Sequence, residues 1–100
     1  MYEKKILLGL IRAHILHHAD SAEGIYGSWM MCELEGHGYS ISPGTLYPIL
    51  HGLKKDGAVD VEEVLVDGKI RKVYRITDKG REALKRMKGF VRELSEEVLD

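Results

Sequence analysis

The sequence predicts a mainly α-helical domain that carries a small β-hairpin and ends in one further helix. Apolar residues recur with helical spacing in the first half of the chain and again near its end. Between these regions, residues 59–66 and 70–76 alternate between apolar and polar types, as β-strands do. A chain of 100 residues is one domain by length. Domains of this size are only marginally stable, so core added by a partner would stabilise this one.

The composition is that of a soluble globular protein. Charged residues make up 31% of the chain and apolar residues 44%. Its apolar runs stay well short of the roughly 20 residues that cross a membrane. We therefore expect a mature cytoplasmic protein without a membrane partner. The single Cys32 excludes an intramolecular disulfide and fits a reducing compartment.

The charge distribution is uneven along the chain. The net charge of -1 argues weakly against nucleic acid as a partner, because phosphate binding requires positive charge. Cations nevertheless concentrate in the middle of the chain, at Lys54, Lys55, Lys69, Arg71, Lys72 and Arg75. Acidic residues crowd its end, at Glu93, Glu96, Glu97 and Asp100. A local basic surface can therefore override the overall sum.

A first helix is predicted from Glu3 to about His18. Its apolar residues with near-helical spacing are Ile6, Leu7, Leu10, Ile11 and Ile15. His14 and His18 stand four residues apart and can share a metal ion, but this pair lacks the third ligand and the acid of a normal metal site. The alternative is that these two and His17 are solvated at a helix C-terminus, where positive charge is favourable. We therefore predict no metal site and no cofactor.

A second helix is predicted from about Ile25 to Glu35. Within it, Trp29 and Met30 are candidates for the wall of a pocket that takes a flat, apolar small-molecule effector. The alternative, which general burial tendencies favour, is that both belong to the core. Cys32 would serve as a redox sensor only if it were exposed and had a lowered pKa.

The segment from Leu34 to Gly57 predicts a turn and a third helix. Ser42 is a favoured N-cap residue, and Pro43 fits the first helical position. The apolar face of this helix consists of Leu46, Ile49, Leu50 and Leu53. The other side carries Gly44, Pro48, His51 and Lys55, flanked by Thr45, Tyr47, Gly52 and Lys54. Pro48 should remove a helical hydrogen bond, so the helix is either tight or kinked at its start, or becomes regular only later.

Two helices joined by a short turn that contains glycine describe a helix-turn-helix, in which the second helix is the recognition helix. An ordinary αα-hairpin with a solvated polar side is the alternative for this segment alone.

A β-hairpin follows the third helix. Val59 and Val61, then Val64 and Val66, predict a strand interrupted at Glu62-Glu63, and Asp67-Gly68 is a typical hairpin turn. On the return strand we expect one face to hold Ile70, Tyr74 and Ile76, and the other to hold Arg71, Val73 and Arg75. A hairpin directly after a recognition helix is the order of a winged helix, in which the hairpin is the wing.

The last helix is predicted to start at Thr77-Asp78, where a cap and an acidic first turn are favourable. Its apolar residues repeat with heptad spacing, and they are Leu84, Met87, Val91, Leu94 and Val98, with Phe90 widening the stripe. Because the run is too long to pack fully on so small a core, we expect it to form a dimer; packing within one chain is the alternative. The expected division is a winged helix-turn-helix domain at 1–77 and a dimerisation helix at 78–100.

Three groups of residues resemble the PadR-type family of transcriptional regulators. They are Tyr26-Gly27, residues 38–50 (GYSISPGTLYPIL) and residues 71–80 (RKVYRITDKG). The resemblance covers most of the chain from Ile25 to about Leu84. It implies a winged-helix domain with a C-terminal dimerisation helix that binds a pseudo-palindromic operator as a homodimer. The wing departs from the family pattern, because Gly68-Lys69-Ile70-Arg71-Lys72 keeps the charge but lacks the usual proline.

The resemblance makes a DNA-binding transcriptional repressor the expected function. Residues expected in or beside the major groove are Ser42, Thr45, Tyr47, His51, Lys54 and Lys55. The wing residues Lys69, Arg71 and Lys72 are expected to reach phosphates or the neighbouring minor groove. The alternative is a winged-helix module that binds a protein and has no DNA-binding activity. An enzyme is not expected, because the sequence shows no catalytic triad, metal-ligand cluster or phosphate-binding glycine loop.

Overall fold

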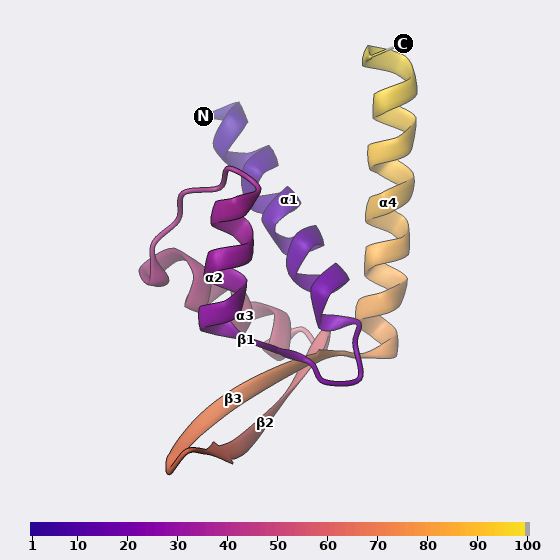
Figure 1. Ribbon diagram of the computed structural model, residues 1–100. Coiled ribbons are helices and arrows are strands. Elements are labelled where there is room, and N and C mark those ends of the chain that lie inside the picture. Colours follow the sequence, from indigo (N-terminus) through magenta and orange to yellow (C-terminus); the bar gives the residue numbers. More distant parts are fainter. Residues whose placement is uncertain (100) are drawn as a thin grey trace.

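The computed structural model describes residues 1–99 and confirms a mainly α-helical fold with a small antiparallel sheet (Figure 1). Its elements are α1 (Tyr2–Ala19), β1 (Ile25–Tyr26), α2 (Gly27–Gly36), α3 (Pro43–Lys55), β2 (Val59–Val66), β3 (Lys69–Ile76) and α4 (Asp78–Val98). The β2–β3 hairpin projects from one end of the molecule, and α4 stands beside α1 with the chain ends at the opposite end. Within residues 1–99, no helix combines the length and the apolar character that a membrane span needs.

The core lies between the first three helices and the sheet. Side chains with almost no exposed surface include Ile11 and Ile15 of α1, Met30 and Leu34 of α2, Leu46 and Leu50 of α3, and Val59 of β2. The four residues predicted for the apolar face of α3 are all buried. Their burial fixes which side of α3 faces solvent, and that side is the one predicted to be polar.

The turn before α3 is held mainly by backbone hydrogen bonds. Helix α2 ends at Gly36, Gly38 has a φ of +91°, and the Tyr39 amide donates to the Leu34 carbonyl over 2.9 Å. Such a left-handed residue after a helix end favours glycine. Pro43 begins α3 as predicted, and the helix continues through Pro48 to Lys55. The proline is therefore accommodated within the helix, and it lies on the side that faces away from the core.

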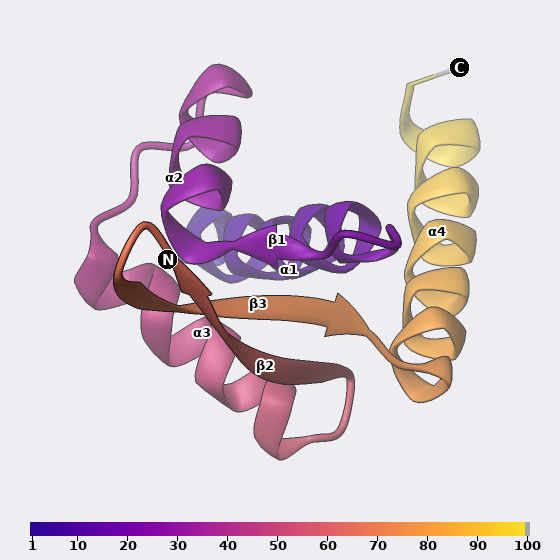
Figure 2. The same cartoon turned by 60° about the horizontal axis from the view of Figure 1, so that its bottom comes forward.

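The hairpin pairs in continuous register from Val59 opposite Ile76 to Val66 opposite Lys69 (Figure 2). The turn residues Asp67 and Gly68 both have positive φ, at 50° and 78°, as a two-residue type I′ turn requires. The prediction that the strand is interrupted at Glu62-Glu63 was wrong, because β2 continues through both residues. Both glutamate side chains are exposed, so the strand can continue without burying their charges.

Strand β1 was not predicted. Ile25 and Tyr26 were expected to begin the second helix, but they pair with Tyr74 and Val73 of β3, and α2 begins only at Gly27. This short strand makes the sheet order β1-β3-β2. It also explains why Val73, expected on the face of Arg71 and Arg75, is only 4% exposed: the chain at Gly24 crosses directly over it.

Helix α4 begins where the hairpin ends. The Thr77 hydroxyl accepts a hydrogen bond from the Gly80 amide at 3.0 Å and donates to the Gly57 carbonyl, which confirms the predicted cap. Gly80 and Leu84 are buried, so the first turns of α4 belong to the same core as the other helices. Beyond Met87 the helix leaves the core. The division of the chain at residues 77 and 78 stays a prediction.

Candidate nucleic-acid interface

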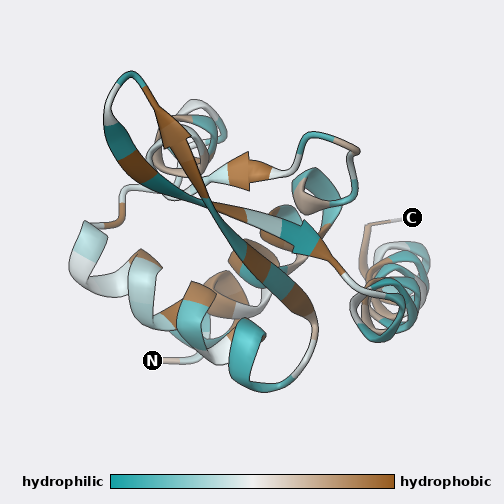
Figure 3. Ribbon diagram, turned by 90° about the horizontal axis from the view of Figure 1, so that it is seen from below, coloured by the Kyte–Doolittle hydropathy of each residue, from teal (hydrophilic) through white to brown (hydrophobic). Residues whose placement is uncertain are grey.

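The exposed side of α3 and the hairpin lie next to each other on one face of the molecule (Figures 2 and 3). Hydrophilic residues dominate the outer side of α3, and apolar residues turn inwards. Tyr47, His51, Lys54 and Lys55 are all exposed on α3. The fold thus presents four of the predicted recognition-helix residues on the same surface as the wing.

A first hollow joins α3 to the wing through Tyr47 and Arg71. It has a volume of about 370 Å³, and its lining includes Tyr26, Ser28, Tyr47, Arg71 and Lys72. The Arg71 guanidinium donates to the Ser28 hydroxyl over 2.8 Å and lies 4.2 Å from the centre of the Tyr26 ring. These contacts hold a cation close to the N-terminus of α2, where backbone N–H groups are unpaired and negative charge is favoured.

Tyr47 is placed in this hollow by a glycine. A Cβ atom at Gly27 would lie 2.7 Å from Tyr47 Cε1 and 2.9 Å from its hydroxyl oxygen. The Tyr47 ring therefore rests directly on the backbone at the start of α2. Burial raises the pKa of Tyr74 on the neighbouring strand, and Tyr47 raises it further, so its phenol stays protonated at neutral pH.

A second hollow joins the end of α3 to the middle of the wing. It measures about 150 Å³, and its lining includes His51, Lys54, Glu63, Lys72 and Tyr74. Glu63 stands opposite Lys72 in the hairpin register and places one negative charge among the cations. Lys72 lines both hollows, so it connects the two parts of the surface.

The remaining predicted contact residues lie elsewhere on the same domain. Ser42 and Thr45 line a different hollow of about 620 Å³, together with Lys4 of α1. Lys55 ends α3, and Lys69 is at the tip of the hairpin. Arg75, which belongs to the same basic stretch of sequence, is paired with Glu62 at 2.7 Å. The structure therefore groups Tyr47, His51 and Lys54 most closely with the wing cations Arg71 and Lys72.

Sequence reasoning missed the contribution of the segment before α2. The sequence predicts all three of Tyr26, Gly27 and Ser28 inside a helix, and this is wrong only for Tyr26, which belongs to β1. None of the three was predicted to line the first hollow, as all of them do. The pairing of β1 with β3 brings these residues to the hollow. A strand of two residues has no periodicity, so the sequence could not reveal this pairing. Tyr26-Gly27 did stand out in the family resemblance, but without a structural role.

The candidate effector residues divide between core and surface. Met30 is completely buried in the core, which bears out the alternative for that residue. Trp29 is 45% exposed, and its ring meets the His18 ring edge-on at a centroid distance of 5.2 Å. Cys32 is exposed on the same helix.

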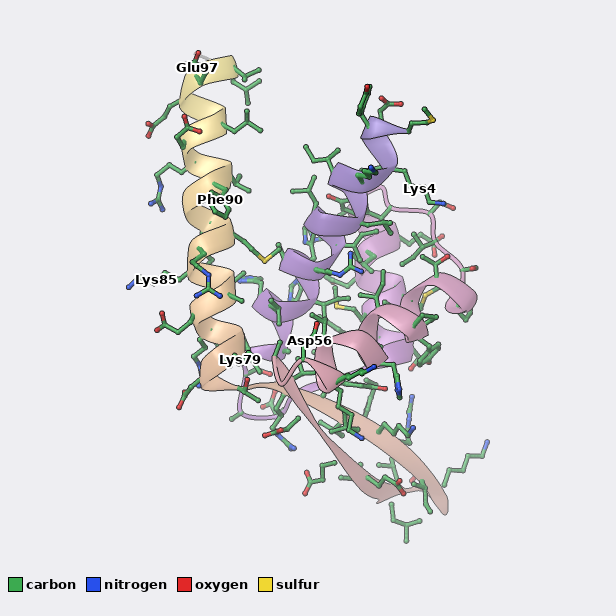
Figure 4. All side chains as sticks on the ribbon, turned by 180° about the vertical axis from the view of Figure 1, so that it is seen from behind. Lys4, Asp56, Lys79, Lys85, Phe90 and Glu97 are labelled. Atoms are coloured by element: carbon green, nitrogen blue, oxygen red, sulfur yellow. The ribbon has the colours of Figure 1, made fainter. Side chains whose placement is uncertain are left out.

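The apolar stripe of α4 faces α1 across an open groove. The groove measures about 490 Å³, and its lining includes Ile6 and Leu10 of α1 with Phe90, Val91 and Leu94 of α4. Phe90 is 72% exposed and Val98 64%, whereas Leu84 lies in the core. Figure 4 shows Lys85 pointing away from α1, so the charged side of α4 is the opposite one. Of the stripe, Phe90, Val91, Leu94 and Val98 remain uncovered within the described chain.

The histidines at the end of α1 gain a neighbour that the sequence did not indicate. One potential ligand atom from each of His14, His18 and His37 lies within 4.8 Å of the others. Burial lowers the pKa of His14, and His37 lowers it further. Burial also lowers the pKa of His18, while Glu33 acts in the opposite direction.

Known proteins resemble this chain over most of its length. A family model described as the transcriptional regulator PadR-like family matches residues 15–86. A Mycobacterium tuberculosis protein named as a transcriptional regulator is 51% identical over 89 residues, which are 89% of this chain and 82% of that protein. A PadR-like transcription factor structure from Bacteroides fragilis has a TM-score of 0.80 at 28% identity, covering 97% of this chain and 94% of its own. A PadR-like regulator structure from Bacillus cereus has a TM-score of 0.77 at 32% identity, covering 96% and 97% respectively.

Proposed function

Because the chain belongs to the PadR-like family of transcriptional regulators, we propose that it binds DNA as a homodimer and represses transcription from a pseudo-palindromic operator. The observation that carries this proposal is the shared surface of α3 and the wing, where Tyr47, Arg71 and Lys72 line one hollow. As a cytoplasmic binding protein it would carry out no chemical reaction of its own.

The exposed side of α3 is proposed to enter the major groove. Because Leu46 and Leu50 anchor the opposite side in the core, His51 and Lys54 project where base edges would lie. The His51 imidazole and the Lys54 ammonium group can each donate a hydrogen bond to a guanine or to a phosphate. Neither group forms the bidentate pair that an arginine makes with guanine. Base recognition would therefore depend on several single hydrogen bonds.

Phosphates are proposed to bind at the first hollow and along the wing. The Tyr47 hydroxyl, the Ser28 hydroxyl and the Arg71 guanidinium lie around the N-terminus of α2. Hydroxyls, cations and free backbone amides are the groups that commonly hold DNA phosphates and fix the register of a protein on the duplex. Lys72 and Lys69 extend this positive surface outwards along the hairpin.

The homodimer is proposed to form through α4 and the first half of α1. Their apolar side chains Ile6, Phe90 and Leu94 line one continuous groove, and an exposed apolar patch of this kind marks an interaction surface. A second copy related by two-fold symmetry would present the same helices. Two copies of α3 would then meet two half-sites about one helical turn, or a multiple of it, apart.

The test of this proposal is a selection of bound sequences from random duplex DNA by the purified protein, read by sequencing. We expect enrichment of an inverted repeat, because a symmetric dimer reads two equivalent half-sites. Light scattering on the same sample establishes whether the protein is a dimer, and circular dichroism establishes that it is folded. No enrichment from a folded dimer would refute DNA recognition and favour a module that binds other proteins.

The role of the wing is tested by replacing Arg71 and Lys72 together with alanine. Each lost phosphate contact reduces the slope of log affinity against log salt by about 0.9, so a dimer would lose up to about 3.6. Affinity should fall for every DNA sequence. The matched control is Lys85→Ala with Arg86→Ala, which likewise removes one lysine and one arginine, both from exposed positions on α4. An unchanged slope in the wing variant, or an equal change in the control, would refute the assignment.

A further inference from the structure

Three histidines and a glutamate bring the end of α1 to the end of α2. His14 and His18 lie one helical turn apart on α1, and His37 is the residue that caps α2. Each histidine offers one ring nitrogen to the cluster, and these three nitrogens lie within 4.8 Å of one another. Glu33 joins them, because its Oε1 lies 3.4 Å from His18 Nε2 and 3.1 Å from His37 Nε2.

These groups have the ligand types and nearly the spacing of a four-coordinate metal site. Imidazole nitrogen suits zinc, copper, nickel and iron, and a carboxylate oxygen is a common further ligand of zinc. Zinc–nitrogen bonds of about 2.0–2.1 Å in a tetrahedral site place ligand atoms about 3.3 Å apart. The two distances from Glu33, 3.4 and 3.1 Å, are close to this value. The histidine nitrogens lie within 4.8 Å of one another and would have to approach by rotation of their exposed or half-buried rings.

The surroundings of the cluster favour a defined site over loose surface histidines. The His14 ring is flanked by His37, at a centroid distance of 4.8 Å, and by the Tyr39 ring, at 5.2 Å. The Trp29 ring meets the His18 ring edge-on at a centroid distance of 5.2 Å. These contacts restrict the rings, and ligands held in advance bind a metal more tightly than free side chains do.

We propose that His14, His18 and His37 bind a divalent transition metal ion such as Zn²⁺, with the Glu33 carboxylate as the fourth ligand. The ion would join the end of α1 to the end of α2, immediately before the turn that leads into α3. The binding of the metal does not depend on the proposed DNA-binding function. Any effect of the metal on DNA binding does rest on that function.

The test is a zinc titration of protein prepared without a polyhistidine tag, in competition with a chromophoric chelator. Every variant carries Cys32→Ser, because an exposed thiol is itself a zinc ligand. We expect one Zn²⁺ per chain and a change in fluorescence from Trp29, the only tryptophan, which contacts His18. Zinc should also raise the melting temperature, because it binds the folded state.

His14→Gln and His37→Gln are each expected to weaken zinc binding by at least about 100-fold, since loss of outer-shell partners alone costs 10- to 100-fold. The matched control is His17→Gln, an exposed histidine on the same helix turn that supplies none of the clustered ligand atoms, although its ring lies 4.9 Å from the His18 ring. It should change the affinity far less than the loss of a ligand does. Circular dichroism checks the fold of each variant, and His37→Gln, at an exposed position, remains informative if His14→Gln unfolds the protein.

The proposal is overturned if the parent binds zinc no more tightly than the two cluster variants, or if His17→Gln weakens binding as much as they do. No DNA is present in these measurements. A failure of the zinc experiment therefore leaves the DNA-binding proposal intact, and an unsuccessful operator selection leaves the metal site intact.

Discussion

Replacing Gly80 with alanine should strongly destabilise the junction between the wing and α4. A Cβ atom at this position would lie 2.1 Å from the Ala58 carbonyl oxygen and 2.7 Å from Ile76 Cγ1. The first neighbour is backbone at the base of the hairpin and cannot rotate away. The alanine can therefore fit only if the first turn of α4 moves away from the sheet.

The size of this effect follows from the contacts that such a movement breaks. The Thr77 amide donates to the Ala58 carbonyl at 3.0 Å, and the Gly80 amide donates to the Thr77 hydroxyl at 3.0 Å. Each hydrogen bond contributes about 1 kcal/mol net. Overpacking costs about 1–3 kcal/mol more, and the better helix propensity of alanine returns up to about 1 kcal/mol. We expect a net loss of about 2–4 kcal/mol from the free energy of unfolding.

Thermal and urea unfolding at one fixed protein concentration measure the change. The melting temperature should fall by about 10–30 °C in a domain of this size. Gly89→Ala, the same substitution in the middle of the same helix, is the control. A Cβ at Gly89 faces open space within the described chain, so this variant should gain up to about 1 kcal/mol. Equal melting temperatures for the two variants would refute the close approach at Gly80.

Three further predictions concern the interface, the dimer and the histidine cluster. Gly27→Ala should displace the Tyr47 ring and weaken operator binding in gel-shift titrations by about 10-fold, as the loss of roughly 1.4 kcal/mol implies; an affinity equal to that of the parent would contradict the proposed phosphate contact. Leu94→Glu should convert the dimer to a folded monomer in light scattering, whereas Lys85→Glu should leave it dimeric. The folded state lowers the pKa of His14 below its usual 6.5, so the unfolded chain takes up this proton first as the pH falls. The contribution of neutral His14 to the free energy of unfolding should therefore be complete above pH 6.5 and decrease as the pH falls through and below that value. Urea unfolding from pH 8 downwards measures this loss, and His14→Gln should reduce it; a profile identical to that of the parent would show that His14 plays no part.

The helices and the hairpin could be predicted because each carries a long, regular signal. Leu46, Ile49, Leu50 and Leu53 define one face of α3, and the Asp67-Gly68 turn fixes the hairpin register. Strand β1 could not be predicted, because two residues contain no period. Its position is decided by tertiary pairing with β3, and the residues that it adds to the interface were missed for the same reason.

The candidate sites were predictable only where one element supplies all their residues. The α3 residues and the wing residues were each identified from a single stretch of sequence, and the fold decided which of them meet. The His14 and His18 pair was visible as a helical spacing. Glu33 and His37 come from another helix, so only the packing of α1 on α2 completes the cluster.

The pairing of β1 with β3 determines the order in which this chain can fold on the ribosome. Ile25 and Tyr26 leave the exit tunnel early, but their partners Tyr74 and Val73 follow only after the whole helix-turn-helix. Leu84 completes the same core later still. We therefore expect that after synthesis of the first half the helices still lack part of the core that covers their apolar faces. Stable structure should form only once the last third of the chain is present. A fragment ending at Gly57 should accordingly lack the cooperative unfolding of the 100-residue chain.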